Sequence, residues 1–304
     1  MDTLSEILAL LKPRSYITAG FDAGGDWCLR LDDLKGRVKC YAVVEGVCWL
    51  SPEEGADPIE LTAGDSFILP SGRAVTIGSA PGLAPTLVSE ALAPDRSGET
   101  VVHNGGGDVL LGGSRFEAGG LHATKLLETL PTILLLRGAA DQAALRWTIR
   151  QMMDELRRGR PGADAMAQNL ASMMLVQTLR LYLEGEDDGA VSWLAAMGDP
   201  GLARALNALH GDPARRWTLE ALGAEAGMSR TVFARRFREK TGETPLAYLT
   251  RWRMTLAAEQ LNAGATVAQA AEAVGYGSET AFGTTFRRVT GLSPRRYALT
   301  RTAG

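Results

Sequence analysis

The sequence predicts a two-domain α+β protein, with a strand-rich N-terminal domain, a helical segment behind it and an all-α C-terminal domain. Three observations lead to this prediction. The chain has 304 residues, about twice the length of a typical domain. Short β-branched and aromatic runs dominate its first part, whereas apolar residues spaced three and four apart dominate after residue 120. A sequence motif near the C-terminus occurs twice, which indicates an internal repeat. We place the parts at residues 1–120, 121–190 and 191–304.

Residues 37–80 are predicted to form a series of short strands. The runs KCYAVV, VCWL, DSFILP and AVTIG are separated by glycine, proline and acidic turns. A glycine- and proline-rich stretch follows, in which VSEAL, VVH and DVLLG are candidates for two or three further strands. This pattern predicts a small antiparallel barrel or sandwich.

Two amphipathic helices are predicted between residues 139 and 185. Met173 and Met174 widen the apolar stripe of the second helix, which fits packing against the strand-rich domain and a dimer interface equally well. The acidic run EGEDDG at residues 184–189 reads as a linker. The apolar positions that define the two faces are Leu145, Ile149, Met152 and Leu156, then Leu170, Met174 and Leu181.

The C-terminal domain contains the repeat. FARRFREKTGETP at residues 233–245 returns as FGTTFRRVTGLSP at residues 282–294. A short helix capped by a threonine, Thr218 or Thr266, and then a glycine turn, precede each copy. Two short helices joined by such a turn are the plan of a helix-turn-helix unit. One match alone is weak evidence, because packed helical hairpins are common, but two in tandem strongly indicate DNA binding.

A long helix is predicted between the two copies. The segment PLAYLTRWRMTLAAEQLNAG begins at Pro245, and Gly264 lies beyond the helix end. A helix of about 19 residues spans about 28 Å, close to the roughly 34 Å between successive major-groove faces on one side of DNA. One chain can then place two recognition helices in neighbouring groove segments.

The outer faces of the two repeated helices are the predicted DNA-contacting surfaces, because their paired phenylalanines are expected to point inward. Arginine is the commonest reader of guanine, and the second face has no long base-reading arginine in its middle. We therefore expect the first unit to read sequence and the second mainly to anchor the DNA backbone. The candidate residues are Arg230, Thr231, Ala234, Arg235 and Arg238 in the first unit, and Glu279, Thr280, Gly283, Thr284 and Arg287 in the second.

The charge distribution also favours a polyanion partner for the C-terminal part alone. From residue 213 to the end there are 14 basic and 7 acidic side chains, whereas the rest holds 18 and 28. No phosphate loop, nucleophile–base pair or metal cluster is recognisable, so neither an enzyme, a cofactor nor a metal ion is predicted. PTILLL, the longest later apolar stretch, is far too short for a membrane span, and no export signal opens the chain. We expect a cytoplasmic protein without a membrane partner.

Residues from about 202 to 297 resemble the DNA-binding domain of AraC/XylS-type transcriptional regulators. The likeness rests on AGMSRTVFARRFREKTGETPLAYLTRWRM and VGYGSETAFGTTFRRVTGLSPRRY, with a Gly-x-x-Pro-x-x-Tyr pattern at the end of each unit. The resemblance implies binding in the major groove of double-stranded promoter DNA, with RNA polymerase as a further partner if the protein is an activator. It also implies base contacts from Thr231, Ala234 and Arg235, and from Glu279, Thr280, Gly283 and Thr284.

The N-terminal half resembles the cupin-type sensor domain of a large AraC subgroup, most clearly in LTAGDSFILPSGRAVTIGS. The fold expected is a cupin-like β-barrel with a helical dimerisation segment. Gly64, Pro70 and Gly72 fit the turns of the cupin motif, but Val75 stands where its metal-binding histidine belongs and Ser79 where its asparagine belongs. A cupin enzyme needs several histidines and a carboxylate around one metal. The resemblance therefore implies a non-catalytic pocket for a small-molecule effector.

The residues do not identify the signal. An oxidant switch through Cys28, Cys40 and Cys48 is the alternative to a bound effector, since thiols act in this way in some related regulators. A role for Cys48 as a small core residue competes with that interpretation. Either signal would alter packing against the two helices and thereby the geometry of a homodimer and its promoter binding. The side chains considered for an effector pocket are Trp27, Arg30, Arg37, Tyr41, Trp49 and Arg73.

Overall fold

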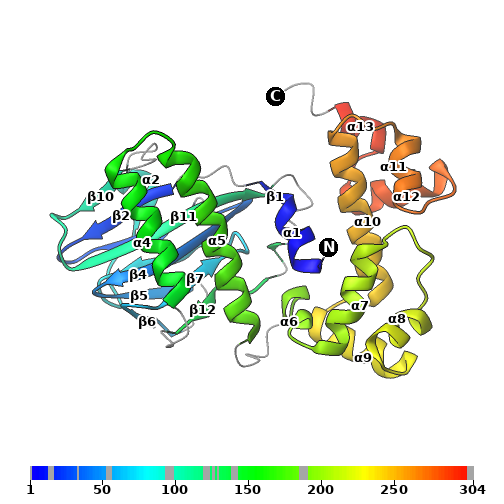
Figure 1. Ribbon diagram of the computed structural model, residues 1–304, viewed down its shortest axis with the longest axis horizontal. Helices are drawn as coiled ribbons and strands as arrows, with labels where there is room; N and C mark the ends of the chain where they lie inside the picture. The colour runs from blue at the N-terminus through cyan, green and yellow to red at the C-terminus, as the bar shows by residue number, and fades with distance from the viewer. Residues whose placement is uncertain are drawn as a thin grey trace. The chain divides into compact units, whose positions relative to one another are not determined.

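The computed structural model describes residues 2–12, 17–32, 34–52, 57–92, 99–118, 124, 127–128, 130–137, 143–184 and 191–299. Contacts divide the chain into two units (Figure 1). The strand-rich unit groups residues 11–118 with 130–186. The helical unit groups residues 1–10 and 119–129 with 187–304, so the N-terminal segment joins the C-terminal part of the chain.

Two β-sheets form the strand-rich unit. The larger has the order β10-β2-β11-β4-β7-β12, with β1 against β11, and the smaller has the order β6-β5-β8-β3-β9. The larger sheet consists of β1 (Leu11–Lys12), β2 (Ile17–Ala23), β4 (Arg37–Glu45), β7 (Ser66–Leu69), β10 (Thr100–His103), β11 (Val109–Ala118) and β12 (Leu134–Leu136). The smaller consists of β3 (Cys28–Leu31), β5 (Val47–Pro52), β6 (Ile59–Thr62), β8 (Val75–Gly78) and β9 (Thr86–Leu87).

The two sheets face each other around one apolar core. Leu29, Leu50 and Ile77 from the smaller sheet pack there with Phe67 and Leu111 from the larger one. Alternation along each strand explains this arrangement, because successive side chains point to opposite faces of a sheet. The strand-rich domain expected from the sequence is confirmed, in its sandwich form.

The cupin-like β-barrel implied by the resemblance is not closed in the part of the chain that the structure describes. Within the described ranges the larger sheet ends at β10 and β12 and the smaller at β6 and β9, and no strand pairing joins the two sheets. The pairs β2–β10 and β3–β9 are also parallel, not antiparallel. Closure is not needed to bury the larger sheet, because helices cover its outer face (Figure 1).

One predicted strand is a helix. VSEAL, residues 88–92, was predicted to form a strand, but its first four residues form α2 (Val88–Ala91), directly after the two-residue strand β9. Glutamate, alanine and leucine are good helix formers, which outweighs the single β-branched valine here. The other predicted strands are confirmed as β4, β5, β7, β8, β10 and β11.

Two helices, α4 (Ala143–Arg158) and α5 (Ala163–Glu184), pack against each other and against the outer face of the larger sheet. Gly112 of β11 permits the close approach of α4, since a Cβ there would lie 2.9 Å from Ile149 Cγ2 and 3.0 Å from Met153 Sδ. The predicted linker from residue 185 onward lies outside the described residues, as do residues 139–142. The predicted apolar faces are confirmed, with Leu145, Ile149, Met152, Leu156, Leu170 and Met174 buried and Leu181 half-buried.

The helical unit begins with α1 (Thr3–Leu10), which the sequence did not predict. The backbone N–H and the hydroxyl of Thr3 donate to Oδ1 of Asn207 at 2.9 and 2.8 Å. No helix of the described chain is long and apolar enough to cross a membrane. The other helices are α6 (Trp193–Met197), α7 (Pro200–Gly211), α8 (Leu219–Ala226), α9 (Arg230–Thr241), α10 (Pro245–Asn262), α11 (Val267–Ala273), α12 (Glu279–Thr290) and α13 (Pro294–Leu299).

Candidate DNA-binding surface

The first helix-turn-helix unit consists of α8, a turn and α9. The Thr218 hydroxyl accepts from the backbone N–H of Ala221, and Gly227 ends α8 in the left-handed region with φ 70°. The Ser229 hydroxyl then caps α9. Gly223 brings the two helices close together, because a Cβ at this position would lie 2.9 Å from the carbonyl oxygen of Met228. The caps and the turn predicted from the sequence are confirmed.

The second unit repeats this plan with α11 and α12. The Thr266 hydroxyl and the Gln269 side chain form a capping box at the start of α11. Gly275 supplies a left-handed turn residue with φ 79°, and the Ser278 hydroxyl caps α12. The turn glycine and the serine cap are two positions apart in the first unit, Gly227 and Ser229, and three apart in the second, Gly275 and Ser278. This one extra turn residue changes the offset between the two copies from 48 to 49 residues.

Matching aromatic clusters hold the two recognition helices. In the first unit the ring centroids of Phe233 and Phe237 lie 5.6 Å apart, and those of Phe237 and Tyr248 5.6 Å apart at 78°. In the second, Phe286 lies 5.4 Å from Tyr297 at the same interplanar angle of 78°. All four phenylalanines of the repeat are buried. The repeated sequence motif therefore encodes two copies of one aromatic packing arrangement.

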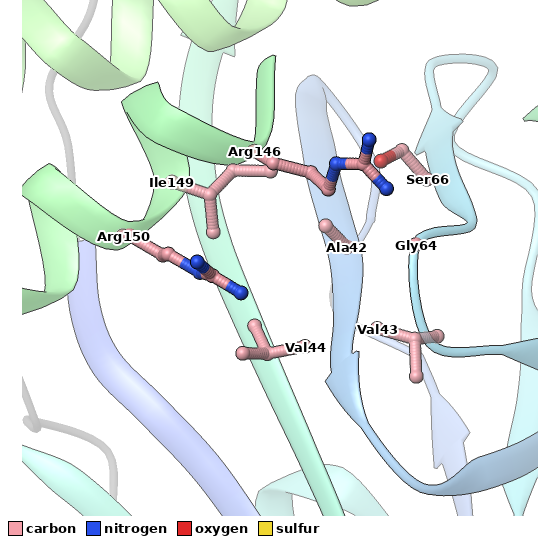
Figure 2. A pocket seen from close by; sticks show the side chains of 8 residues that line it. All are labelled: Ala42, Val43, Val44, Gly64, Ser66, Arg146, Ile149 and Arg150. Carbon is pink, nitrogen blue, oxygen red and sulfur yellow. The ribbon is translucent and has the colours of Figure 1, made fainter. Parts of the chain in front are cut away.

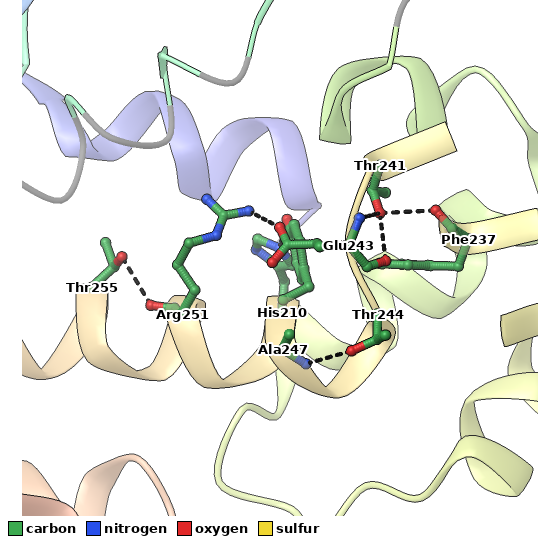
Figure 3. Close-up of polar contacts among 9 residues, drawn as sticks. His210, Phe237, Thr241, Glu243, Thr244, Ala247, Arg251 and Thr255 are labelled. Carbon is green, nitrogen blue, oxygen red and sulfur yellow. Dashed lines mark hydrogen bonds and ion pairs between the residues drawn. The ribbon is translucent and has the colours of Figure 1, made fainter. Parts of the chain in front are cut away.

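The repeated Thr-Gly pair forms the end of each recognition helix. Gly242 and Gly291 have φ 78° and 83°, and their N–H groups donate to Arg238 and Arg287 carbonyls. The Thr241 hydroxyl donates to the carbonyl of residue 243 at 3.1 Å and accepts from the N–H of the same residue at 3.3 Å (Figure 3). Thr290 makes the equivalent bonds with residue 292, at 2.9 and 3.1 Å. These repeated residues are structural.

The candidates on α9 lie on one exposed face. Arg230 pairs with Glu220 of α8 at 2.9 Å, and Arg235 pairs with Glu239 one turn further along at 3.2 Å. Both pairs are more than half exposed, so each contributes little to stability. Each arginine can therefore readily exchange its glutamate partner for a phosphate or a base. Arg230, Thr231, Arg235 and Arg238 are all exposed, and Ala234 is half-buried beside them.

The candidates on α12 form a face with smaller side chains and fewer basic groups. Thr284 is exposed, but its hydroxyl donates to the Thr280 carbonyl at 2.9 Å and is used within the helix. A Cβ added at Gly283 would meet nothing within 4 Å, so this position presents only backbone. Glu279 lies at the start of the helix and Arg287 in its last turn, both exposed.

Several arginines near this surface support the fold. Arg236 follows Arg235 directly, yet its Nε lies 2.6 Å from Oδ2 of the buried Asp199, which also caps α7. Arg253 donates to the carbonyls of Pro213 and Arg215 at 2.6 and 2.8 Å. The sequence did not reveal these roles, because both carbonyls and Asp199 lie far from their arginines along the chain.

The histidine and asparagine positions of the cupin motif have structural roles in the strand-rich unit. Val75 is fully buried between the sheets. The Ser79 hydroxyl accepts from the backbone N–H of Trp27 at 3.0 Å and donates to its carbonyl at 3.3 Å. Within the described ranges, no group of three His, Cys, Asp or Glu side chains could hold a metal ion.

The six effector candidates are dispersed. Trp27 is buried in the core and Tyr41 packs against it, with Tyr41 and Phe67 ring centroids 5.3 Å apart. Arg73 is exposed and donates to Thr132 at 3.1 Å. Arg30 is exposed, and Arg37 and Trp49 are half-buried. None of the six lines the cavity that lies beneath α4, whose walls come from other residues (Figure 2).

The three cysteines are poor thiolates. Burial raises the pKa of Cys40 to about 12, against a weaker opposing effect of the hydrogen bond with Thr178. Burial and the charge of Asp65 raise the pKa of Cys48 to about 12 as well. Burial also raises the pKa of the half-buried Cys28. A reactive sensor thiol needs the opposite shift.

Comparison with known proteins agrees with the two units. The chain matches the Cupin family over residues 2–184 and the helix-turn-helix domain family over residues 222–299. A putative AraC-like transcription regulator of Streptomyces lividans is 40% identical over 98% of both chains, and one of Streptomyces antibioticus is 38% identical over the same shares. A solved structure of the DNA-binding domain of AdpA in complex with a target DNA is 33% identical and covers 35% of this chain and 99% of its own, with a TM-score of 0.33. The chain belongs to the AraC-like family of transcription regulators, with a cupin domain ahead of a DNA-binding helix-turn-helix domain.

Proposed function

We propose that the protein reads promoter DNA by placing α9 and α12 in two successive segments of the major groove. The pair of matching helix-turn-helix units carries this proposal, since each presents an exposed helix fixed from behind by the same aromatic cluster. Their spacing supports it, because the 18 residues of α10 span about 27 Å, near the roughly 34 Å repeat of DNA. Figure 1 shows α10 running between the two helix-turn-helix units.

The two units divide the work unequally. Arg235 lies mid-helix on α9, more than half exposed and restrained only by an exposed pair with Glu239, so it is free to turn towards a guanine. The corresponding part of α12 carries Gly283 and Thr284, whose hydroxyl is bonded within the helix. The basic candidate on this face is Arg287, which lies in the last turn of the helix. The first unit therefore reads base edges, and the second contributes mainly phosphate contacts.

Selection of bound genomic fragments from the source organism tests this function. Purified full-length protein and Arg235→Ala are compared at one fixed, moderate salt concentration. We expect wild type to enrich a few discrete DNA sites and Arg235→Ala to enrich them less. Salt-sensitive binding to all fragments, unchanged in Arg235→Ala, would show that the basic surface only grips phosphates.

We also propose that the protein acts as a homodimer in the cytoplasm, and that a small-molecule effector of the strand-rich unit adjusts promoter occupancy. Trp147 on α4 and Met166 and Met173 on α5 are 55%, 51% and 41% exposed, which is unusual for such apolar side chains. RNA polymerase is a partner if the regulator activates. Sedimentation of wild type beside Trp147→Ser tests the dimer, and a wild-type monomer at micromolar concentration, with and without DNA, argues against it.

A further inference from the structure

A cavity of about 40 Å³ lies between α4 and the helix-covered face of the larger sheet (Figure 2). The floor comes from β4 and from the turn into β7, and α4 forms the roof. Its lining residues are Ala42, Val43, Val44, Gly64, Ser66, Arg146, Ile149 and Arg150.

Small residues in the sheet create this space. Ala42 and Ser66 are directly paired in the β4–β7 ladder, and Gly64 stands just before β7. The next pair on the same face, Cys40 and Ile68, is larger and fully buried. The backbone of α4 cannot move closer to the sheet at one residue pair alone. The small Ala42–Ser66 pair therefore leaves a gap beneath the helix.

Two arginines one helical turn apart, Arg146 and Arg150, extend over the gap (Figure 2). Like charges at this spacing destabilise a helix. Among the described residues no carboxylate pairs with either guanidinium, and Asp154, one turn beyond Arg150, pairs with Arg158 at 3.2 Å instead. Both arginines are exposed, so the mouth of the cavity carries two positive charges without a counter-ion from the described residues.

We propose that this cavity binds the carboxylate group of a small organic acid and is the effector site of the strand-rich unit. Guanidinium groups bind carboxylates strongly, often through two parallel hydrogen bonds. The volume has room for about three water-sized groups, which matches a carboxylate. Val44 and Ile149 provide an apolar wall for a short hydrocarbon part. This proposal rests on the proposed effector-controlled function.

Binding here acts directly on α4. An acid held between Arg146, Arg150 and the floor residue Ser66 draws the first half of the helix towards β4 and β7 and removes the repulsion between the two arginines. Trp147, on the same turn, belongs to the exposed apolar side chains proposed for dimerisation. Occupancy of the cavity is thereby coupled to the surface that joins two protomers.

Titration of the full-length protein with butyrate tests the proposal, with uncharged butyramide and inorganic phosphate as comparison probes. Thermal unfolding and calorimetry are recorded for wild type, for Arg146→Gln/Arg150→Gln and for Arg157→Gln, an exposed arginine of α4 outside the cavity. We expect butyrate to stabilise wild type and Arg157→Gln, and its Kd to rise at least about tenfold in the double variant. Butyramide should have no effect and phosphate should bind more weakly than butyrate.

Three results overturn the proposal: no butyrate binding to wild type, equal binding to the double variant, or phosphate binding tighter than butyrate. Without ligand the double variant should be at least as stable as wild type, because glutamine removes the repulsion between the two guanidinium groups. Lost binding would therefore not reflect unfolding. DNA binding by the same proteins, measured without acid, separates the two proposals. If DNA sites are selected but no acid binds, only the effector site is wrong.

Discussion

The hydroxyl oxygen of Tyr248 lies 2.8 Å from Nε2 of His210, and both side chains are buried. This contact joins the last turn of α7 to the first turn of α10, and the Trp252 ring covers the imidazole with a centroid distance of 4.1 Å. Glu243 and Arg251 form an ion pair beside it (Figure 3). In the second unit the equivalent tyrosine, Tyr297, bonds to an asparagine instead. The first recognition unit is thus anchored to α7 by a histidine that the second lacks.

The His210 contact makes stability depend on pH. Burial, aided by the charge of Arg251, lowers the pKa of His210 from 6.5 to about 3. The folded protein therefore binds fewer protons than the unfolded chain between these values, so stability is full above about pH 6.5 and falls as the pH drops towards 3. The loss is at most about 1.4 kcal/mol per pH unit.

Hydrogen exchange in α7 and α10 between pH 6.5 and 5 measures this loss, with His210→Gln as the comparison. The carboxylate of Glu6, whose Oε2 lies 3.5 Å from Nδ1 of His210, has a pKa raised by burial. Protonation of Glu6 therefore favours the folded state and acts in the opposite direction to protonation of His210. An equal pH slope in wild type and variant between pH 6.5 and 5 would rule out the histidine as the cause.

Two helix-interior glycines should respond to alanine in opposite ways. A Cβ at Gly283 meets nothing within 4 Å, so Gly283→Ala should stabilise the helical unit by up to about 1 kcal/mol. A Cβ at the buried Gly223 would lie 2.9 Å from the Met228 carbonyl oxygen, so Gly223→Ala should destabilise it by about 1 to 3 kcal/mol. Urea unfolding measures both, and stabilisation by Gly223→Ala would contradict the close packing of α8 on the turn.

The cysteines should be slow to react in the folded protein. Because burial raises the pKa of Cys40 and of Cys48 to about 12, neither supplies thiolate at neutral pH. Iodoacetamide labelling followed by mass spectrometry should modify the half-buried Cys28 first, and the other two only after denaturation. Rapid labelling of Cys40 or Cys48 under native conditions would restore the oxidant switch as an explanation of the signal.

Adjacent arginines on α9 should have separable effects. Arg236→Ala leaves the buried Asp199 carboxylate without its cation and should lower the stability of the helical unit by about 1 to 3 kcal/mol. Arg235→Ala breaks only an exposed pair and should leave stability unchanged within about 0.5 kcal/mol. Urea unfolding of the two variants decides this, and the reverse order would show that the two side chains have been assigned to the wrong roles.

The features that the sequence predicted correctly are the helix caps and turns that local residue patterns specify. Thr218, Ser229 and Gly227 each specify a cap or a turn through their own backbone and side chain, and the repeat doubled that information. The pairing of Arg236 with Asp199 depends on residues brought together only by folding, as does the docking of Thr3 on Asn207. The open edges of the two sheets and the small floor of the cavity under α4 are likewise set by tertiary packing, and the β-strand pattern alone could not distinguish a barrel from a sandwich.

The most direct test of unequal reading is the affinity of wild type, Arg235→Ala and Arg287→Ala for one selected site and for a scrambled duplex, each measured over a range of salt concentrations. Arg235→Ala should lose about 1 to 3 kcal/mol on the site and little on the scrambled duplex, whereas Arg287→Ala should weaken both equally and reduce the salt slope by about one. If Arg235→Ala weakens both duplexes equally, α9 contacts only phosphates through this residue, and the central claim that the first unit reads the sequence is wrong.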